Sequence, residues 1–443
     1  MALVHFLSLG CDKNLTDTEA MLGLLHKAGH SFTEDPARAD VIVINTCSFI
    51  GDAKKESIDA ILEMAAYKEK GNCRALLAAG CLAERYQTEI LQELPELDGV
   101  LGTASYPHIA EAVDEALKAR AGRNKRWFED VNTLPMVKER ILTTGGHYAY
   151  LKIAEGCDKY CSYCAIPQAR GRYRSLPVEF LEQQAWELAE KGVSELILVA
   201  QETTLYGTDL YGKKALPALL SRIEKIEGLR WIRLLYGYPE ELTEEMTDYM
   251  ASSGKLCHYL DLPVQHAADS VLGRMGRRTN RREVSALIQR LRDKIPDIAL
   301  RTTLISGFPG ETEEEHQANL SFIREMEFDR LGVFTYSREE GTAAYKMPGQ
   351  IPKRIKERRR RELMLAQQPV AFAKARAMAG RELEVMVEGF LPEQNIYVAR
   401  SYMDAPEVDG LVFFEDSGDR ESGSFVRLRI TRARDYDLVG ELL

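Results

Sequence analysis

The sequence predicts an α/β protein with three domains: an open α/β sheet over residues 1–135, a partial TIM barrel of (β/α)6 form over 145–370, and a small β-barrel over 376–443. Three patterns carry this prediction. Strand-like apolar runs alternate with helical segments in the first third, a strand-then-helix unit repeats in the middle, and short alternating strands close the chain. A length of 443 residues has room for two or three domains of ordinary size.

The first domain is predicted from apolar runs that are bounded by turn residues, a pattern typical of buried parallel strands. The runs span 4–9, 41–44 and 75–79, and helical segments lie near 16–29 and 50–70. A cysteine follows each run: Cys11, Cys47 and Cys81. Because ligands bind at the carboxyl ends of the strands in an open α/β sheet, we expect these cysteines to converge at one edge.

Free cysteine is also a common core residue, and any one of these three alone would be better explained by burial. Three cysteines at equivalent strand ends instead favour metal ligation. Three thiolates also leave one iron of a [4Fe–4S] cluster open to a further ligand. Cys73 precedes its strand and Cys257 begins another, so we expect both to be structural.

A second cysteine triplet follows the strand-like run 150–154. Cys157, Cys161 and Cys164 form a C-x3-C-x2-C pattern, and the next cysteine is Cys257. A structural zinc site requires four protein ligands, whereas a [4Fe–4S] cluster with an open iron requires three. The spacing therefore predicts a cluster, with a zinc knuckle or three buried thiols as the alternatives.

The central domain is predicted from six strand candidates, which with their intervening helices suit an open partial barrel. They lie at 149–154, 195–200, 231–236, 258–263, 300–306 and 331–336. Catalytic residues of such barrels lie at the carboxyl ends of strands, where this sequence places polar clusters. The clusters include Gln201, the pair Gln265-His266 and the pair Ser306-Gly307. We expect His266 to be an orienting or core histidine rather than a metal ligand.

The carboxyl-terminal domain is predicted from short strands at 382–388, 397–400, 411–414, 424–430 and 437–442, which are typical of a small β-barrel. A charged helix with a basic stripe at 353–361 precedes it; a solvated helix face explains this stripe at least as well as a nucleic-acid contact. Residues 376–443 hold 8 Lys and Arg against 14 Asp and Glu, a net charge of −6. We therefore expect this domain to repel phosphate and to attract a basic protein.

The whole chain has a net charge of −10, which argues mildly against a polyanion as its main partner. The amino terminus lacks the pattern of a signal peptide, and no apolar run is long enough to cross a bilayer. We therefore expect a cytoplasmic protein with no membrane partner, in a compartment where thiols stay reduced.

Together these motifs resemble those of the radical SAM methylthiotransferase family. The resemblance rests on the triplet at 157–164 and on the segments 8–19, 45–47, 79–81 and 301–312. It implies a transferase with two [4Fe–4S] clusters and S-adenosylmethionine as cofactors. Cys157, Cys161 and Cys164 would hold the cluster that binds S-adenosylmethionine, and Cys11, Cys47 and Cys81 an auxiliary cluster that supplies sulfur. The implied contacts with S-adenosylmethionine are Tyr163, Gln201, Arg301 and Gly307, and the last domain would be TRAM-like.

The segments 11–14, 259–267 and 401–410 are similar to the RimO branch of this family. That branch adds a methylthio group to the β-carbon of an aspartate in small-subunit ribosomal protein twelve. The implied partners are this ribosomal protein, either free or within the assembled subunit, and an electron donor. Two rivals are a tRNA adenosine methylthiotransferase and a non-catalytic metal-binding or RNA-binding module. The second rival is disfavoured because two open cysteine triplets serve no structural purpose.

Overall fold

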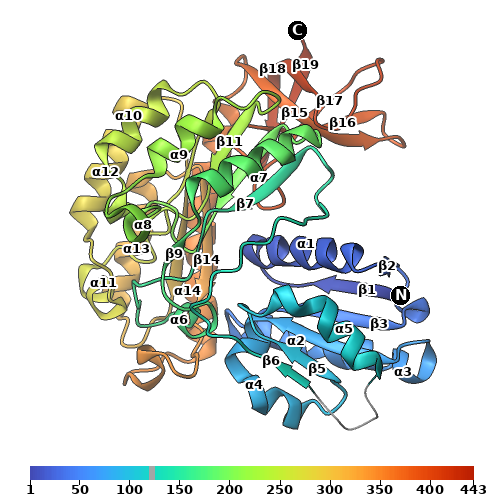
Figure 1. The fold of residues 1–443 in the computed structure, drawn as a ribbon. Coiled ribbons are helices and arrows are strands. Elements are labelled where there is room, and N and C mark those ends of the chain that lie inside the picture. The colour runs from blue at the N-terminus through green and yellow to red at the C-terminus, as the bar shows by residue number, and fades with distance from the viewer. Residues whose placement is uncertain (119–124) are drawn as a thin grey trace. The chain divides into compact units, whose positions relative to one another are not determined.

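The structure is a computed structural model that describes residues 1–118 and 125–443. The chain divides into two compact units, traced in Figure 1. The first unit comprises Met1–Thr143, Lys152–Pro177 and Ser337–Tyr345. The second comprises Thr144–Leu151, Val178–Tyr336 and Lys346–Leu443.

The first unit contains a parallel six-stranded sheet in the order β2-β1-β3-β4-β5-β6. Its strands are β1 (Leu3–Ser8), β2 (Ser31–Phe32), β3 (Val41–Thr46), β4 (Ala75–Gly80), β5 (Gly99–Leu101) and β6 (Lys125–Trp127). The three apolar runs of the sequence are confirmed as β1, β3 and β4. The edge strand β2 and the short strands β5 and β6 were not predicted.

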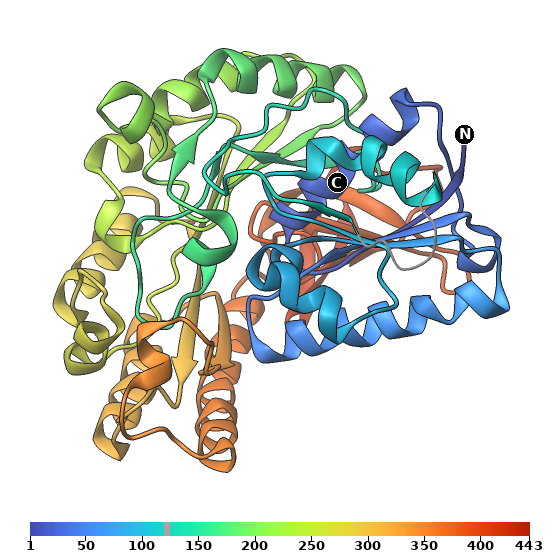
Figure 2. The same ribbon diagram turned by 60° about the horizontal axis from the view of Figure 1, so that its bottom comes forward.

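Helices cover both faces of this sheet, as Figure 2 shows. They are α1 (Asp12–Lys27), α2 (Gly51–Ala65), α3 (Tyr67–Lys70), α4 (Cys81–Glu93) and α5 (Ile109–Lys118). Successive strand residues point to opposite faces, so β3 contributes to two cores. Val41 and Val43 pack with α1 and α5, whereas Ile42 and Ile44 pack with α2 and α4. This arrangement brings the loops after β1, β3 and β4 to one edge.

The first unit also contains a short antiparallel pair that flanks the second cysteine triplet. Its elements are β8 (Ala154–Glu155), α6 (Ile166–Arg170) and β9 (Arg174–Ser175). Gly171 accepts the Cys157 N–H at 3.1 Å through its carbonyl oxygen, so the triplet loop returns to its own start.

The second unit contains a sheet in the order β14-β13-β12-β11-β10-β7, with parallel pairing from β10 to β14. The strands are β7 (Tyr148–Lys152), β10 (Glu195–Val199), β11 (Trp231–Leu234), β12 (Leu256–Asp261), β13 (Ala299–Ser306) and β14 (Arg330–Thr335). The helices are α7 (Val178–Glu190), α8 (Thr208–Tyr211), α9 (Leu216–Ile223), α10 (Glu244–Ser252), α11 (Asp269–Met275), α12 (Arg281–Lys294), α13 (Glu313–Met326) and α14 (Lys353–Arg376). The helices curve around the outside of the strands (Figures 1 and 2), as predicted for a (β/α)6 partial barrel.

The chain ends in a closed five-stranded barrel with the strand order β15-β16-β17-β19-β18. The strands are β15 (Glu382–Leu391), β16 (Ile396–Ser401), β17 (Val412–Phe414), β18 (Phe425–Arg434) and β19 (Asp437–Leu442). The predicted small β-barrel is therefore confirmed. It packs against the six-stranded sheet of the same unit, and the ring centroids of Phe425 and Trp231, the first residue of β11, are 4.9 Å apart.

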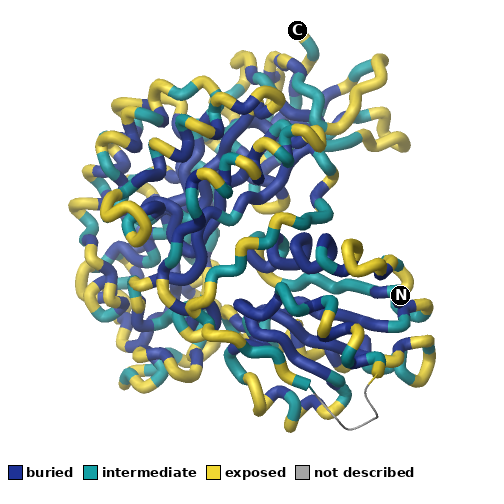
Figure 3. The backbone as a smooth tube through the Cα atoms, viewed as in Figure 1, coloured by how far each residue is buried: buried dark blue, intermediate teal, exposed yellow. Residues whose placement is uncertain are grey.

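The buried residues follow the strands of both units, and the exposed residues lie mainly on the outer helices and the loops (Figure 3). Within the described residues, no helix combines the length and the apolar character that crossing a membrane requires.

Candidate functional site

The first cysteine triplet lies at the carboxyl ends of the strands, as the sequence predicts. Cys11 immediately precedes α1, Cys47 follows the last residue of β3, and Cys81 is the first residue of α4. Gly10 has a φ of +92°, and a Cβ there would lie 2.8 Å from the Cys47 Cβ. Glycine therefore lets the loop that carries Cys11 approach the loop that carries Cys47 closely.

The thiols of this triplet are close enough to influence one another. Burial raises the pKa of Cys81 to about 12, and the charges of Cys11 and Cys47 raise it further, while Arg170 opposes them. Burial also raises the pKa of Cys47, with a contribution from Cys11. Three neighbouring thiols are a fitting donor set for a metal cluster, because soft thiolate ligands select iron–sulfur clusters and the metal displaces the protons.

The second triplet lies in the loop between β8 and α6. Cys157 and Cys161 are buried and Cys164 is half-buried. The Cys164 N–H donates to the Cys161 carbonyl oxygen at 2.9 Å, which closes a tight turn around Tyr163. Burial raises the pKa of Cys164 to about 12, with contributions from Cys161 and Cys157, so these thiols also neighbour one another. All six cysteines belong to the first unit.

Two arginines that the sequence analysis missed lie beside the triplets. Arg170, the last residue of α6, donates from Nε to the Cys81 Sγ at 3.3 Å. Arg85 of α4 donates to the Ser48 carbonyl oxygen at 3.0 Å, and its charge lowers the pKa of Cys164. The sequence signal for them was their position close to a cysteine of a triplet, since Arg170 follows Cys164 by six residues and Arg85 follows Cys81 by four.

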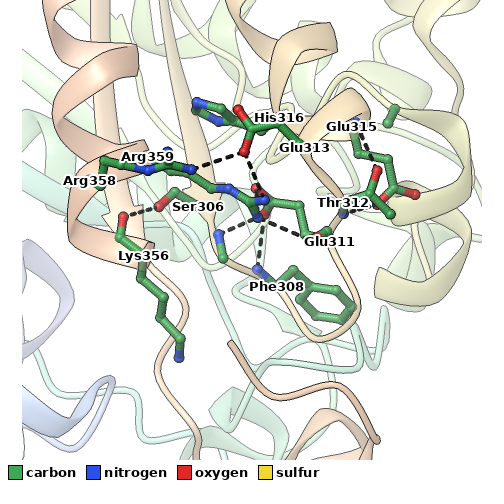
Figure 4. A network of polar contacts seen from close by, with 12 residues as sticks. Ser306, Phe308, Glu311, Thr312, Glu313, Glu315, His316, Lys356, Arg358 and Arg359 are labelled. Carbon is green, nitrogen blue, oxygen red and sulfur yellow. Dashed lines mark hydrogen bonds and ion pairs between the residues drawn. The ribbon is translucent and has the colours of Figure 1, made fainter. Parts of the chain in front are cut away.

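The glycine-rich segment after β13 is folded around one carboxylate, Glu311 (Figure 4). The Glu311 Oε2 atom accepts the backbone N–H of Gly307 at 2.6 Å and that of Phe308 at 3.1 Å, and Oε1 accepts Arg359 Nη1 at 3.0 Å. Burial alone would raise the pKa of Glu311, but His266 and Arg359 outweigh it and hold the pKa below its ordinary value. The turn at the carboxyl end of β13 is therefore rigid.

The capping box predicted at the start of the next helix is present. Thr312 Oγ1 accepts the Glu315 N–H, and the Glu315 carboxylate accepts the Thr312 N–H. His266 is buried, and its Nδ1 accepts the Ala268 N–H at 3.0 Å. This fits the expectation of an orienting histidine.

The four residues expected to contact the cofactor are placed as follows. Tyr163 is half-buried between Cys161 and Cys164 in the first unit. Gln201 is buried two residues after β10, and Gly307 directly follows β13, so both lie at carboxyl ends of strands in the second unit. Arg301 differs: its Nη1 is 2.8 Å from the Asp409 Oδ1 of the β-barrel domain.

The geometry gives Arg301 a structural role. Its Nε is also 3.7 Å from the Asp261 Oδ1, so two carboxylates occupy the guanidinium. The Asp409 side chain is fully buried in this contact, and Tyr259 Oη donates to its Oδ2 at 2.7 Å. Arg301 therefore ties the β-barrel domain to β13, and its contact with a cofactor stays a prediction.

Among the described residues, Glu313, His316 and Glu362 are the one group of three His, Cys, Asp or Glu side chains whose ligand atoms all lie within 4.8 Å of one another. Arg358 binds Glu313 at 2.9 Å and lies 3.7 Å from Glu362, and Arg359 also contacts Glu313 (Figure 4). The two carboxylates are therefore already neutralised by guanidinium groups, which leaves little attraction for a cation.

Three known families match successive parts of the chain, in the order of the open sheet, the partial barrel and the small β-barrel. Residues 3–102 match the uncharacterized protein family UPF0004, residues 151–323 match the radical SAM superfamily, and residues 379–443 match the TRAM domain.

Curated relatives match the chain from end to end. It is 55% identical over 438 residues to the "ribosomal protein uS12 methylthiotransferase RimO" of Lachnoclostridium phytofermentans, with 99% of each chain covered. It is 49% identical to the protein of the same name from a Thermoanaerobacter species, with 100% of each covered.

Among solved structures, the fold is similar to the radical S-adenosylmethionine methyltransferase TsrM of Kitasatospora setae. The TM-score is 0.57 at 13% identity, over 77% of this chain and 76% of that chain. The cobalamin-dependent S-adenosylmethionine radical enzyme OxsB gives a TM-score of 0.51 at 14% identity, over 84% and 56%. At these identities the likeness concerns the fold alone.

Proposed function

This chain belongs to the RimO family of ribosomal protein uS12 methylthiotransferases, within the radical SAM superfamily, and we propose that it adds a methylthio group to the β-carbon of an aspartate in uS12. It is a transferase that uses S-adenosylmethionine and [4Fe–4S] clusters. The family predicted from the sequence motifs is thereby confirmed.

The observation that carries the proposal is the presence of two separate cysteine triplets in one compact unit. We propose that Cys11, Cys47 and Cys81 hold an auxiliary cluster, and that Cys157, Cys161 and Cys164 hold the cluster that binds S-adenosylmethionine. Each set offers three thiols, which supports a cluster with one iron left open rather than a closed zinc site.

The clusters, when bound, supply the electron that cleaves S-adenosylmethionine and the sulfur that is transferred. The chain itself buries and positions these groups. Glu311 fixes the Gly307 turn at the carboxyl end of β13, and the lack of a side chain at Gly307 lets Lys356 approach this turn closely. Tyr163, Gln201, Arg301 and Gly307 remain the proposed contacts with S-adenosylmethionine. The proposed domains are 1–135 for the auxiliary cluster, 145–370 for the radical chemistry and 376–443 for substrate docking.

The docking surface on the β-barrel is proposed from its exposed acidic residues, because opposite charges favour encounter with a basic ribosomal protein. Glu393, Glu415 and Asp419 are exposed on two loops next to β16. The Tyr397 hydroxyl of β16 donates to the Gly418 carbonyl oxygen at 2.8 Å, which anchors the second loop. An external electron donor and the assembled small subunit complete the proposed partners.

The experiment that tests this function compares uS12 from a strain lacking the gene with uS12 from the same strain carrying it. Mass spectrometry of uS12 peptides should reveal a methylthio-aspartate only when the gene is present. A gene with a Cys11→Ala, Cys47→Ala and Cys81→Ala triple substitution should fail to restore it. If uS12 were unmodified and tRNA adenosines lost a methylthio group instead, the substrate assignment would be wrong.

A further inference from the structure

We propose that Arg170 is a positioning residue that tunes the auxiliary cluster, by donating an N–H···S hydrogen bond to Cys81 and by fixing the segments that carry the two cysteine triplets. This inference rests on the proposed ligand role of Cys81. It assigns Arg170 to the functional site, although Arg170 is not an iron ligand.

Arg170 contacts the Cys81 thiol from a buried position. The Arg170 side chain is only 3% exposed, and its Nε lies 3.3 Å from the Cys81 Sγ. Its Nη2 donates to the Asn14 Oδ1, and the Cys81 Sγ lies 3.6 Å from that same oxygen. A hydrogen bond to a cluster sulfur stabilises the more negative, reduced state, so such bonds raise the reduction potential of iron–sulfur clusters.

The charge of the Arg170 guanidinium is balanced by neighbouring carboxylates. Arg170 Nη1 lies 2.6 Å from the Asp17 Oδ2 and 3.0 Å from the Glu155 Oε2. Lys152 Nζ binds both of these carboxylates, at 2.7 Å in the case of Glu155. Two cations and two anions therefore neutralise one another. The two carboxylates therefore compensate the cost of burying the guanidinium charge without any contribution from the thiols. The Nε–H of Arg170 is left to donate to the sulfur of Cys81.

Arg170 and its partners lie close to the two cysteine triplets along the chain. Asn14 and Asp17 lie in the first turns of α1, directly after Cys11. Glu155 precedes Cys157 by two residues, and Arg170 follows Cys164 by six. One side chain thus joins the segments that carry both triplets. Arginine suits this task because its planar group offers five donors in a fixed arrangement, whereas lysine offers a single ammonium.

The test uses the full-length chain with Cys157, Cys161 and Cys164 replaced by Ala, so that reconstitution loads only the auxiliary cluster. The midpoint potential of that cluster is measured by potentiometric titration followed by electron paramagnetic resonance. Arg170→Gln should lower the potential so that the reduced-to-oxidised ratio at a fixed poise falls about tenfold, which is about 59 mV for a one-electron couple. Asp17→Asn should shift the potential upward, because it leaves the charge of Arg170 less neutralised.

The matched control is Arg172→Gln, the same substitution at an exposed position two residues away, which should leave the potential unchanged. Opposite shifts in Arg170→Gln and Asp17→Asn support the inference, whereas shifts of the same sign, or none, overturn it. If the Arg170→Gln variant binds no iron, the midpoint potential of the Asp17→Asn variant decides. An upward shift supports the inference, and a downward shift or no shift overturns it. If the parent chain takes up no iron on Cys11, Cys47 and Cys81, the ligand assignment fails first, and the inference fails with it.

Discussion

At the scale of single residues, position in the fold separates the six cysteines proposed as ligands from the other two. Cys73 and Cys257 are buried like Cys47, yet Cys73 packs in the core between β3, β4 and α2, and Cys257 lies within β12. Burial raises the pKa of Cys257 to about 12, and it raises the pKa of Cys73 as well. Because burial raises the pKa of Cys81 and Cys164 in the same way, the place in the fold separates the two groups and the pKa does not.

We predict that Cys73→Ala and Cys257→Ala leave iron content and methylthio transfer unchanged, because neither thiol neighbours a triplet. Each substitution should cost only about 1–2 kcal/mol of unfolding free energy from the lost packing. Iron assay and chemical denaturation measure the two effects. Loss of half the iron in either variant would show that a ligand has been misassigned.

Gly307 gives a second prediction at this scale. Its φ is +73°, and a Cβ there would lie 2.4 Å from the Lys356 Cγ. Gly307→Ala should therefore destabilise the second unit by about 1–3 kcal/mol, the usual cost of a side chain in this conformation. It should also weaken binding of S-adenosylmethionine. The control is Gly254→Ala, where an added Cβ meets no atom within 4 Å. Equal melting temperatures for the two variants would contradict the prediction.

The sequence predicted residue placement where it depends on local order along the chain. Cys11, Cys47 and Cys81 were found because each follows a strand. The ion pair of Arg301 with Asp409, which lies 108 residues further on, was not predicted. No pattern within one segment reports such a pairing, and the same holds for the contact of Arg170 with Cys81.

At the scale of elements, a buried ion network joins the β-barrel to the six-stranded sheet. Glu195, the first residue of β10, binds Arg233 of β11 at 2.7 Å and Arg400 of β16 at 2.6 Å. Arg400 also binds Glu388 of β15 at 2.7 Å. Burial alone would raise the pKa of Glu195, but Arg400 and Arg233 outweigh it and hold the pKa below its ordinary value of 4.5.

We predict that Glu195→Gln costs about 3–5 kcal/mol, because it leaves two buried guanidinium groups without their shared carboxylate. The depressed pKa also sets the pH dependence. The stabilisation is fully present above pH 4.5 and is lost as the pH falls through the lower pKa of the folded state. Unfolding free energies measured from neutral pH to below pH 4.5 check both points. The control is the exposed Glu190→Gln, and a similar acid sensitivity in Glu195→Gln and the parent would contradict the assignment.

The long, strongly apolar elements were predictable and the short ones were not. β3 and β4 are six-residue strands that are buried throughout, so their sequence carries a clear signal. β5 and β6 have three residues each, and β6 includes Lys125 and Arg126, which resemble a loop in sequence. Pairing with a neighbouring strand, rather than local propensity, makes them strands.

At the scale of the whole molecule, the acidic residues of the β-barrel domain are divided between buried and exposed positions. Asp404 and Asp409 are buried, and Arg330 binds Asp404 at 2.5 Å, so these carboxylates hold the barrel on the sheet rather than face a partner. Their reversal to Lys would disrupt the second unit and would not test docking. Of the three acidic residues in this loop, Glu407 is the exposed one.

The docking prediction therefore concerns Glu393→Lys, Glu415→Lys and Asp419→Lys combined. This variant should lower kcat/KM for uS12 severalfold, mainly through slower association, and the difference should shrink at high salt. Cleavage of S-adenosylmethionine without substrate should be unchanged. The control reverses the exposed arginines of β18, Arg427 and Arg429, to Glu. If that control, and not the acidic triple variant, abolished turnover, the partner surface would be a phosphate-bearing one.

The central claim is that the two cysteine triplets hold two clusters with different tasks, and iron content together with product formation tests it most directly. Reconstituted protein should carry about eight irons, and each triple cysteine-to-alanine variant about four. The Cys157, Cys161 and Cys164 variant should form no 5′-deoxyadenosine. The Cys11, Cys47 and Cys81 variant should still form it, yet leave uS12 without a methylthio group. Full iron content in either variant, or methylthio transfer by the second, would contradict the claim.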